Sequence, residues 1–228
     1  TTTIGKDHGK KSADWGKGVH VSQDEGLTWK HYPDPSEEEQ YLEIAIHPTN
    51  PKIIYAPSTH KLYKSVNGGE TFEVAMEFPK PNGGFSSIAT VESNPDWVFL
   101  VTMSKADKSI VRDKARSALY LSKDTGKTWK AIQNMNDSIG YDKSVYSEGF
   151  VGSWLHCFAV NSSNTDEIIT AAVVVNESKD GGNTWQSTPW NNRMKSRNND
   201  GSLTPNKYGR HIADNHVIKF HPKYKSRA

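Results

Sequence analysis

The residues with the clearest potential for chemistry are three carboxylates in polar segments of the chain. Asp142 and Glu148 belong to the run NMNDSIGYDKSVYSEGFVGS, and Asp214 belongs to the run RHIADNH. Hydrolysis of a glycosidic bond commonly uses two carboxyl groups that flank the bond, about 5–10 Å apart. We therefore predict Asp142, Glu148 and Asp214 as the catalytic residues of a glycoside hydrolase, while the sequence leaves open whether the chain is an enzyme at all.

The same polar segments contain side chains suited to holding a polar, partly aromatic ligand. Aromatic rings offer flat faces on which sugar rings can stack, and arginines can clamp an acid group. The predicted ligand-binding residues are Tyr141, Tyr146, Trp154, Trp190, Arg193, Arg210, His211 and His216.

The run H-I-A-D-N-H offers a second kind of chemistry. In a strand, Asp214 and His216 point to the same face, and His211 lies in the loop before it. Histidine and aspartate are suitable metal ligands. A group of this kind at the start of a strand more often makes hydrogen bonds to nearby backbone groups. We therefore predict no bound metal ion, and we expect no cofactor.

The overall composition excludes several classes of protein. Lys and Arg total 28 and Asp and Glu total 26 in 228 residues, and this net charge of +2 is too balanced for binding nucleic acid through bulk charge. The single cysteine, Cys157, excludes an internal disulfide framework. No apolar run approaches the roughly 20 residues that a membrane-spanning helix needs. We expect no nucleic-acid partner and no membrane span.

An eight-residue pattern, which we call the box, recurs four times. It reads SQDEGLTW from Ser22, SVNGGETF from Ser65, SKDTGKTW from Ser122 and SKDGGNTW from Ser178, and the copies start 43, 57 and 56 residues apart. Repeats of roughly 40–60 residues are typical of four-stranded propeller blades with their loops.

The chemistry of the box predicts a tight turn between two strands. Its third residue is Asp or Asn, whose side chain can fold back onto the following backbone. Its fifth residue is glycine, which supplies the positive φ that the turn needs. Its last residue is aromatic, and we expect it to fill the core beneath the turn; these residues are Trp29, Phe72, Trp129 and Trp185.

The segments around each box fit the other strands of a blade. Before the second box, YLEIAIHPTNP, KIIYAPS and KLYKS read as three successive strands separated by turns, and comparable sets precede the third and fourth boxes. No segment has sustained helical periodicity, so we predict an all-β fold. The prediction is a single β-propeller domain or segment over residues 1–228, built of four-stranded antiparallel blades. Its blade parts cover about 17–33, 41–77, 85–133, 154–189 and 214–228. Because the first and last parts are incomplete, we expect an incomplete part of a larger propeller.

The boxes resemble the Asp-box (BNR) repeats of a propeller superfamily. That superfamily includes sialidases, xyloglucan-cleaving hydrolases, sortilin-type receptors and photosystem II assembly propellers. The resemblance covers nearly the whole chain and implies the fold, a structural role for the boxes, and a secreted, periplasmic or extracellular location. It implies little about activity, because these relatives share the blade and differ in the site. This chain departs from the sialidases in having no R-I-P motif and in crowding Arg193, Arg197 and Arg210 into one segment.

Three long insertions are predicted on the face opposite to the boxes, at residues 105–117, 134–153 and 190–215. Long loops on one face of a scaffold often carry function. We therefore predict a carbohydrate-binding or glycoside-hydrolysing propeller. Its expected partners are a polysaccharide or glycan ligand and a further chain that completes the propeller. The alternative is a non-catalytic protein-interaction or assembly propeller, and a face without two facing carboxylates would favour that alternative.

Overall fold

The chain is almost entirely β-structure in the part that the structure describes. The computed structural model describes residues 18–33, 41–78, 86–103, 117–134, 157–171, 175–187, 195–197, 203–205 and 218–220. The strands in these ranges form three four-stranded sheets and two two-stranded sheets, all antiparallel, with no helix in the described ranges. The predicted all-β fold with four-stranded antiparallel blades is confirmed.

Three full blades follow one another along the chain, and the strands of each blade pair in chain order. We number them second to fourth, because a two-stranded half-blade precedes them. The second blade consists of β3 (Ala45–Ile46), β4 (Ile54–Pro57), β5 (Lys61–Ser65) and β6 (Glu73–Glu77). The third blade consists of β7 (Ser86–Thr90), β8 (Val98–Met103), β9 (Ser117–Ser122) and β10 (Lys130–Asn134). The fourth blade consists of β11 (Cys157–Val160), β12 (Ile168–Ala171), β13 (Val175–Ser178) and β14 (Gln186–Ser187).

Two smaller sheets complete the described structure. β1 (Val19–Val21) and β2 (Lys30–Tyr32) flank the first box and form a half-blade, in the place of the third and fourth strands of a full blade. β15 (Lys195–Arg197) and β16 (Leu203–Pro205) pair as a small ribbon inside a segment that we expected to be a loop. Residues 218–220 carry no strand, so the strand predicted within 214–228 is absent from its described part.

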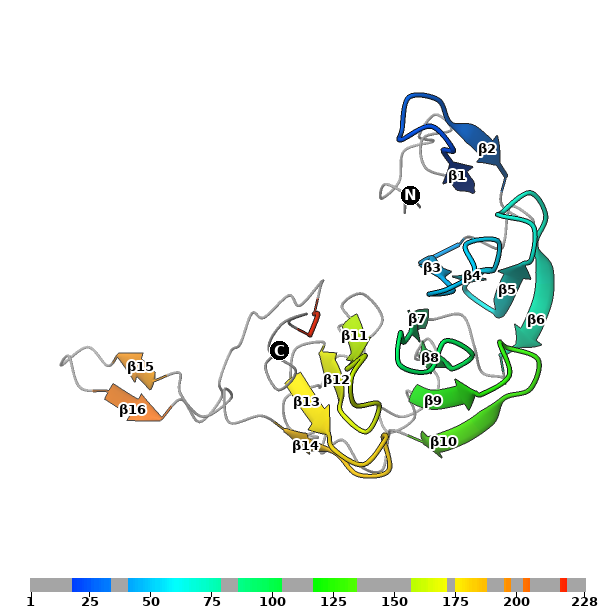
Figure 1. Cartoon of the computed structure of the whole chain (residues 1–228). Helices are drawn as coiled ribbons and strands as arrows, with labels where there is room; N and C mark the ends of the chain where they lie inside the picture. Colours follow the sequence, from blue (N-terminus) through cyan, green and yellow to red (C-terminus); the bar gives the residue numbers. More distant parts are fainter. Residues whose placement is uncertain are drawn as a thin grey trace, which may run out of the picture.

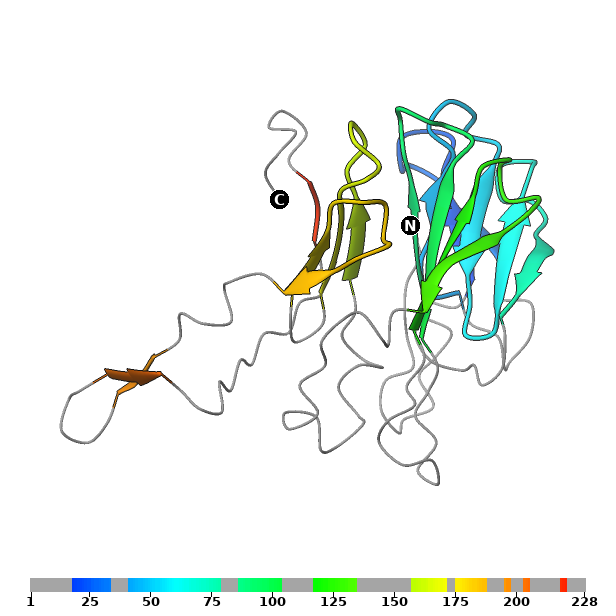
Figure 2. The ribbon, with the colours of Figure 1, turned by 90° about the horizontal axis from the view of Figure 1, so that it is seen from below.

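The half-blade and the three full blades are arranged along an arc (Figure 1). The first strand of each full blade (β3, β7 or β11) lies on the inner side of the arc, and the fourth strand (β6, β10 or β14) lies on the outer side. Figure 2 shows the strands of successive blades running between the same two faces of the arc. This is how the blades of a propeller surround an axis.

Hydrogen bonds and strand register identify what lies on each face. In each full blade the N–H of the fourth box residue donates to a carbonyl in the turn between the first two strands, at 2.9 Å. The box turn and this first turn therefore lie on the same face. The donor and acceptor pairs are Gly68 with Lys52, Thr125 with Asp96, and Gly181 with Asp166. The strand ends that border the long insertions lie at the other face, where Met103 pairs with Ser117 and Ala171 pairs with Cys157.

Hydrophobic side chains fill the spaces between successive blades. Neighbours cover both faces of the second and third blades, and all four residues of β4 are buried, rather than every second one. The half-blade and the second blade meet at Val19, Tyr41, Ala56 and Tyr63. The second and third blades meet at Tyr55, Leu62, Phe78, Ile88, Val98, Leu100 and Tyr120. The third and fourth blades meet at Val91, Phe99, Val101, Leu119, Phe158, Val160, Ile168 and Trp185.

The aromatic residues of the boxes do not all fill the core, and the prediction for Trp29 is wrong. Trp185 is 8% exposed, whereas Trp29 is 51% exposed. The cause is the direction of packing, because each later box turn packs against the blade before it. A Cβ placed on the box glycine would meet Val21 from Gly69, Tyr55 from Gly126 and Leu119 from Gly182. The described residues include no blade before the half-blade, so Trp29 has no neighbour to cover it.

Candidate functional site

The predicted catalytic and ligand-binding residues all fall in segments that the structure does not describe. Outside the described residues lie Asp142, Glu148, Asp214, Tyr141, Tyr146, Trp154, Trp190, Arg193, Arg210, His211 and His216. Their roles therefore stay predictions. The described residues present two other features with a possible bearing on function: the box turns and a groove between the third and fourth blades.

Hydrogen bonds inside the box hold its carboxylate in a fixed position. In the third blade, Ser122 donates its hydroxyl to Asp124 (2.7 Å), and Thr128 donates both its hydroxyl (2.5 Å) and its backbone N–H (2.9 Å) to the same carboxylate. The boxes of Asp24 and Asp180 repeat these contacts. The hydrogen bond from the Thr hydroxyl is the largest cause of the lowered pKa of all three carboxyl groups. These carboxylates shape the turn and are not free for catalysis.

The second box builds the same turn with an amide in place of the carboxylate. Asn67 Oδ1 accepts the Thr71 N–H (3.0 Å) and the Ser65 hydroxyl (2.8 Å), and Asn67 Nδ2 donates to the Thr71 hydroxyl (2.9 Å). Negative charge is therefore not required to form the turn.

The box turn uses positive φ at two consecutive residues, one more than the sequence predicts. The fifth-residue glycines have φ between 82° and 92°, and the fourth residue is also left-handed, including Glu25 at 61° and Thr125 at 57°. The sequence signal for the fourth residue is weak, because only two of the boxes carry glycine there (Gly68 and Gly181).

Polar side chains bridge the second and third blades beside the third box. Tyr55 and Lys64 are cross-strand partners on β4 and β5. The Tyr55 hydroxyl donates to the carbonyl of Thr125 (3.2 Å), and Lys64 Nζ donates to the same carbonyl (2.6 Å). Burial is the main cause of the raised pKa of Tyr55 and of the lowered pKa of Lys64. These two donors connect the second blade to the third box.

Two further titratable groups connect the second and third blades. Glu43 Oε2 accepts the Ile88 N–H (2.9 Å), and burial raises the pKa of this carboxyl group. His47 Nδ1 accepts backbone N–H groups from its own turn, and its Nε2 lies 3.7 Å from Asp96 Oδ1. Among the described residues no group of three or more His, Cys, Asp or Glu is placed to hold a metal ion.

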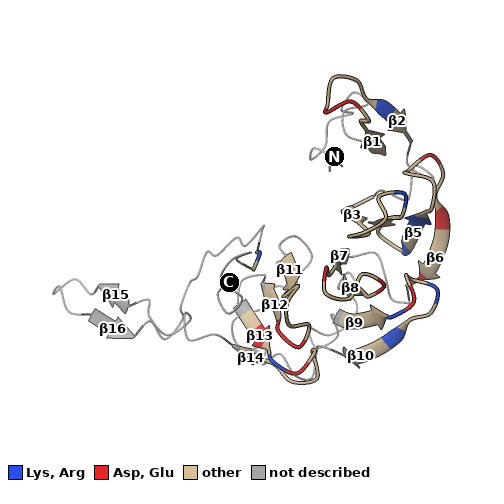
Figure 3. Cartoon of the chain, viewed as in Figure 1, with Lys and Arg blue, Asp and Glu red and all other residues tan. Residues whose placement is uncertain are grey.

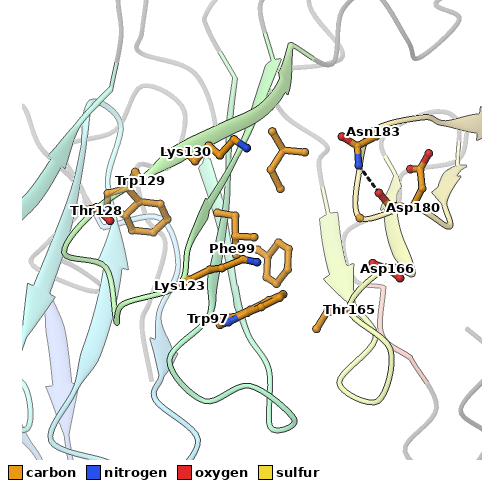
Figure 4. A pocket seen from close by; sticks show the side chains of 13 residues that line it. Trp97, Phe99, Lys123, Thr128, Trp129, Lys130, Thr165, Asp166, Asp180 and Asn183 are labelled. Atoms are coloured by element: carbon orange, nitrogen blue, oxygen red, sulfur yellow. Dashed lines mark hydrogen bonds between the residues drawn. The ribbon is translucent and has the colours of Figure 1, made fainter.

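A groove of about 500 Å³ lies between the third and fourth blades (Figure 4). On the side of the third blade it is lined by Trp97, Phe99, Leu121 and Ile132, together with Lys123 and Lys130. On the side of the fourth blade it is lined by Thr165, Asp166, Asp180 and Asn183. Its floor is apolar because Phe99 is part of the core shared by the two blades.

The two walls of the groove carry charges of opposite sign. Lys123 Nζ lies 4.0 Å from the ring centroid of Trp97, a cation–π contact, and Lys130 is on the same wall. Asp166 is on the opposite wall, and in the described part of the chain no ion pair engages its carboxylate. Elsewhere on the arc, acidic and basic residues are interspersed along the strands and turns (Figure 3).

The groove has the character of a binding site and lacks a free pair of carboxylates. Ligand sites are typically apolar hollows with a few polar groups that orient the ligand. Of the two carboxylates in the lining, Asp180 is held by Ser178 and Thr184, which leaves Asp166. None of the catalytic or ligand-binding residues predicted from the sequence is among the described residues that line this groove. The signal for the groove in the sequence was Trp97, which follows an N-P-D turn. No other full blade has a tryptophan at the equivalent position.

Comparison with solved structures shows the fold. The crystal structure of an ancestral GH74 enzyme is similar over 81% of this chain and 22% of its own, with a TM-score of 0.52 and 16% sequence identity. The GH74 enzyme of Niastella koreensis is similar over 75% of this chain and 26% of its own, with a TM-score of 0.50 and 18% identity. At these identities the likeness concerns the propeller architecture alone. Among the described residues no helix is long and apolar enough to cross a membrane.

Comparison of sequences identifies the family. The vacuolar protein sorting/targeting protein 10 of Schizosaccharomyces pombe is 28% identical over 116 residues, which is 50% of this chain and 8% of that protein. This chain therefore spans only a small part of the length of that relative. Residues 17–169, from the half-blade into the fourth blade, match the family described as Sortilin-Vps10 (Sortilin, neurotensin receptor 3). With that match over more than half of its length and the blades that the structure shows, the chain belongs to the Sortilin-Vps10 family.

Proposed function

We propose that the chain is part of a non-catalytic propeller that binds other proteins in the lumen of the secretory pathway and takes part in their sorting. The match of residues 17–169 to the Sortilin-Vps10 family carries this proposal, and the matched relative is named for vacuolar protein sorting and targeting. This function is the protein-interaction alternative of the sequence analysis. The luminal location follows from the same family match, and the secreted, periplasmic or extracellular location that the resemblance implies stays a prediction.

The box carboxylates are unsuited to act as a general acid or base. A general acid or base must exchange a proton near the working pH. Asp24, Asp124 and Asp180 instead have lowered pKa values, because Thr and Ser donors hold their ionised forms. These groups remain ionised at neutral pH and are occupied by the turn.

The carbohydrate function stays a prediction that depends on Asp142, Glu148 and Asp214. These carboxylates lie outside the described residues. The likeness to GH74 enzymes concerns the fold alone and adds no support for cleavage of a polysaccharide.

The test is binding of the immobilised chain to purified soluble proteins of the vacuolar or lysosomal lumen. We expect saturable binding to at least one of them and none to cytosolic proteins of similar size and isoelectric point. A Trp185→Ala variant serves as control, because loss of this buried core residue should unfold the fourth blade and abolish specific binding. Cleavage of xyloglucan by the chain, without binding to any luminal protein, would overturn the proposal.

A further inference from the structure

We propose that the groove between the third and fourth blades binds an extended peptide segment in which an apolar side chain stands between an acidic and a basic one. This inference rests on the proposed protein-binding function and assigns it a site. The volume of the groove is about 500 Å³, and ligand pockets commonly have volumes of roughly 300–1,000 Å³.

The groove lies where the third blade has no counterpart to the polar bridge of the second. Phe99 and Leu121 are cross-strand partners on β8 and β9, as Tyr55 and Lys64 are on β4 and β5. Aligned from their boxes and turns, the two pairs occupy equivalent positions in the two blades. Phe99 and Leu121 have no hydroxyl or ammonium group, so they cannot reach across to the next box as Tyr55 and Lys64 do.

The missing bridge leaves a backbone acceptor at the groove. The Thr125 carbonyl of the third box receives both donors of the second blade. Its equivalent in the fourth box is the carbonyl of Gly181, a residue that lines the groove. Within the described part of the chain no hydrogen bond reaches the Gly181 carbonyl. A peptide N–H is the natural donor to such a carbonyl.

Charge determines which side chains the peptide should carry. Lys123 and Lys130 on one wall attract an acidic side chain, and Asp166 on the other wall attracts a basic one. The Asp166 backbone is fixed, because its N–H donates to Asn164 Oδ1 (3.3 Å) and its carbonyl accepts the Gly181 N–H (2.9 Å). The carboxylate is therefore presented from a rigid turn. Between the charges, Phe99, Leu121 and Ile132 offer apolar contact for an aliphatic side chain.

The aromatic residues of the groove, Trp97, Phe99 and Trp129, are engaged by the protein itself, which favours a peptide over a sugar. Trp129 packs against the core between the second and third blades, and its Nε1 donates to the Gly126 carbonyl (3.2 Å). A sugar ring stacks on a free aromatic face, but Lys123 already covers a face of the Trp97 ring at 4.0 Å. The Phe99 ring lies 6.4 Å from that of Trp97 and is tilted by 55°. Trp97 therefore supports the wall of the groove, and Lys123 occupies the ring face on which a sugar would stack.

The experiment measures binding of a short fluorescein-labelled peptide, with a leucine pair between a glutamate and an arginine, by fluorescence polarisation. Asp166→Lys should weaken binding about tenfold and should strengthen binding of a peptide whose arginine is replaced by glutamate. The Phe99→Tyr, Leu121→Lys double variant should abolish binding, because it restores the bridge found between the second and third blades. Asp96→Lys is the matched control, since Asp96 holds the equivalent turn position one blade earlier, and it should leave binding unchanged.

Thermal midpoints of all variants establish that each remains folded. Equal binding by the wild type, Asp166→Lys and the double variant would overturn the proposal, as would the absence of peptide binding by the wild type. Undiminished capture of luminal proteins by both groove variants would overturn the groove site and leave the sorting function in place. Peptide binding at the groove without capture of any luminal protein would overturn the sorting function instead.

Discussion

Single side chains in the box show that one turn can be built from two chemistries. Asp124 collects hydrogen bonds from Ser122 and Thr128, and Asn67 collects the equivalent bonds from Ser65 and Thr71. The amide and the carboxylate differ in how they respond to acid, because only the carboxylate takes up a proton. The pKa of Asp124 lies below its usual value of 3.8, since the donors favour the charged form.

The Asp124→Asn variant should separate the contribution of charge from that of shape. A folded-state pKa below the unfolded value stabilises the protein above the unfolded pKa, and this stability is lost as pH falls. The wild type should therefore exceed Asp124→Asn in thermal midpoint above about pH 4, and the difference should shrink as the solution becomes more acidic. Asn67→Asp should show the converse by gaining stability above that pH. Parallel curves for both variants and the wild type would contradict this account.

At the level of strands and sheets, the fold is a series of blades that pack in one direction. The fifth-residue glycine of each later box lies against the preceding blade, where a Cβ would be tight at Gly69 and Gly126 and would collide at Gly182. A Cβ on Gly182 would lie 2.5 Å from Leu119 Cδ2, whereas a Cβ on Gly26 would meet nothing closer than Trp29 at 3.7 Å. Both glycines have a φ near 90°. A comparison of Gly182 with Gly26 therefore separates the cost of backbone strain in the turn from the cost of packing against the preceding blade.

The Gly182→Ala variant should lose more stability than Gly26→Ala. Both pay about 1–2 kcal/mol for a left-handed backbone, and only Gly182→Ala adds overpacking, which costs about 1–3 kcal/mol. The free energy of unfolding from urea titrations would measure the difference. Equal losses at the two sites would show that the box turn does not depend on the blade before it.

The sequence predicted the parts of the fold that depend on neighbours along the chain. The box turns and the strands around them follow from local residue types, and the structure confirms the four-stranded blades. The exposure of Trp29 was not predictable in this way, because it depends on a neighbouring blade. The left-handed backbone of Thr125 was not predictable either, because threonine favours other conformations. The groove required comparison of Phe99 with Tyr55 across blades. The catalytic and ligand-binding predictions remain untested because they concern residues outside the described ranges.

Across the whole arc, stability should differ from blade to blade. Among the described residues, the third blade has four strands and a neighbour on each face, whereas the half-blade has two strands and one neighbour. Hydrogen exchange is slowest where opening requires disruption of the most packed structure. Amides of β8 and β9 should therefore exchange more slowly than those of β1 and β2, as measured by mass spectrometry after pepsin digestion. Uniform exchange over the arc would show that the blades unfold as one unit.

The hydrogen bond from the fourth box residue makes each blade a self-contained module. That bond joins two turns of the same blade, and side-chain contacts reach only the adjacent blade. Interaction with nearest neighbours alone is the property that allows repeat proteins to grow or shrink by whole units. Duplication of the gene segment for one blade would thus add a unit whose two turns are already joined to each other.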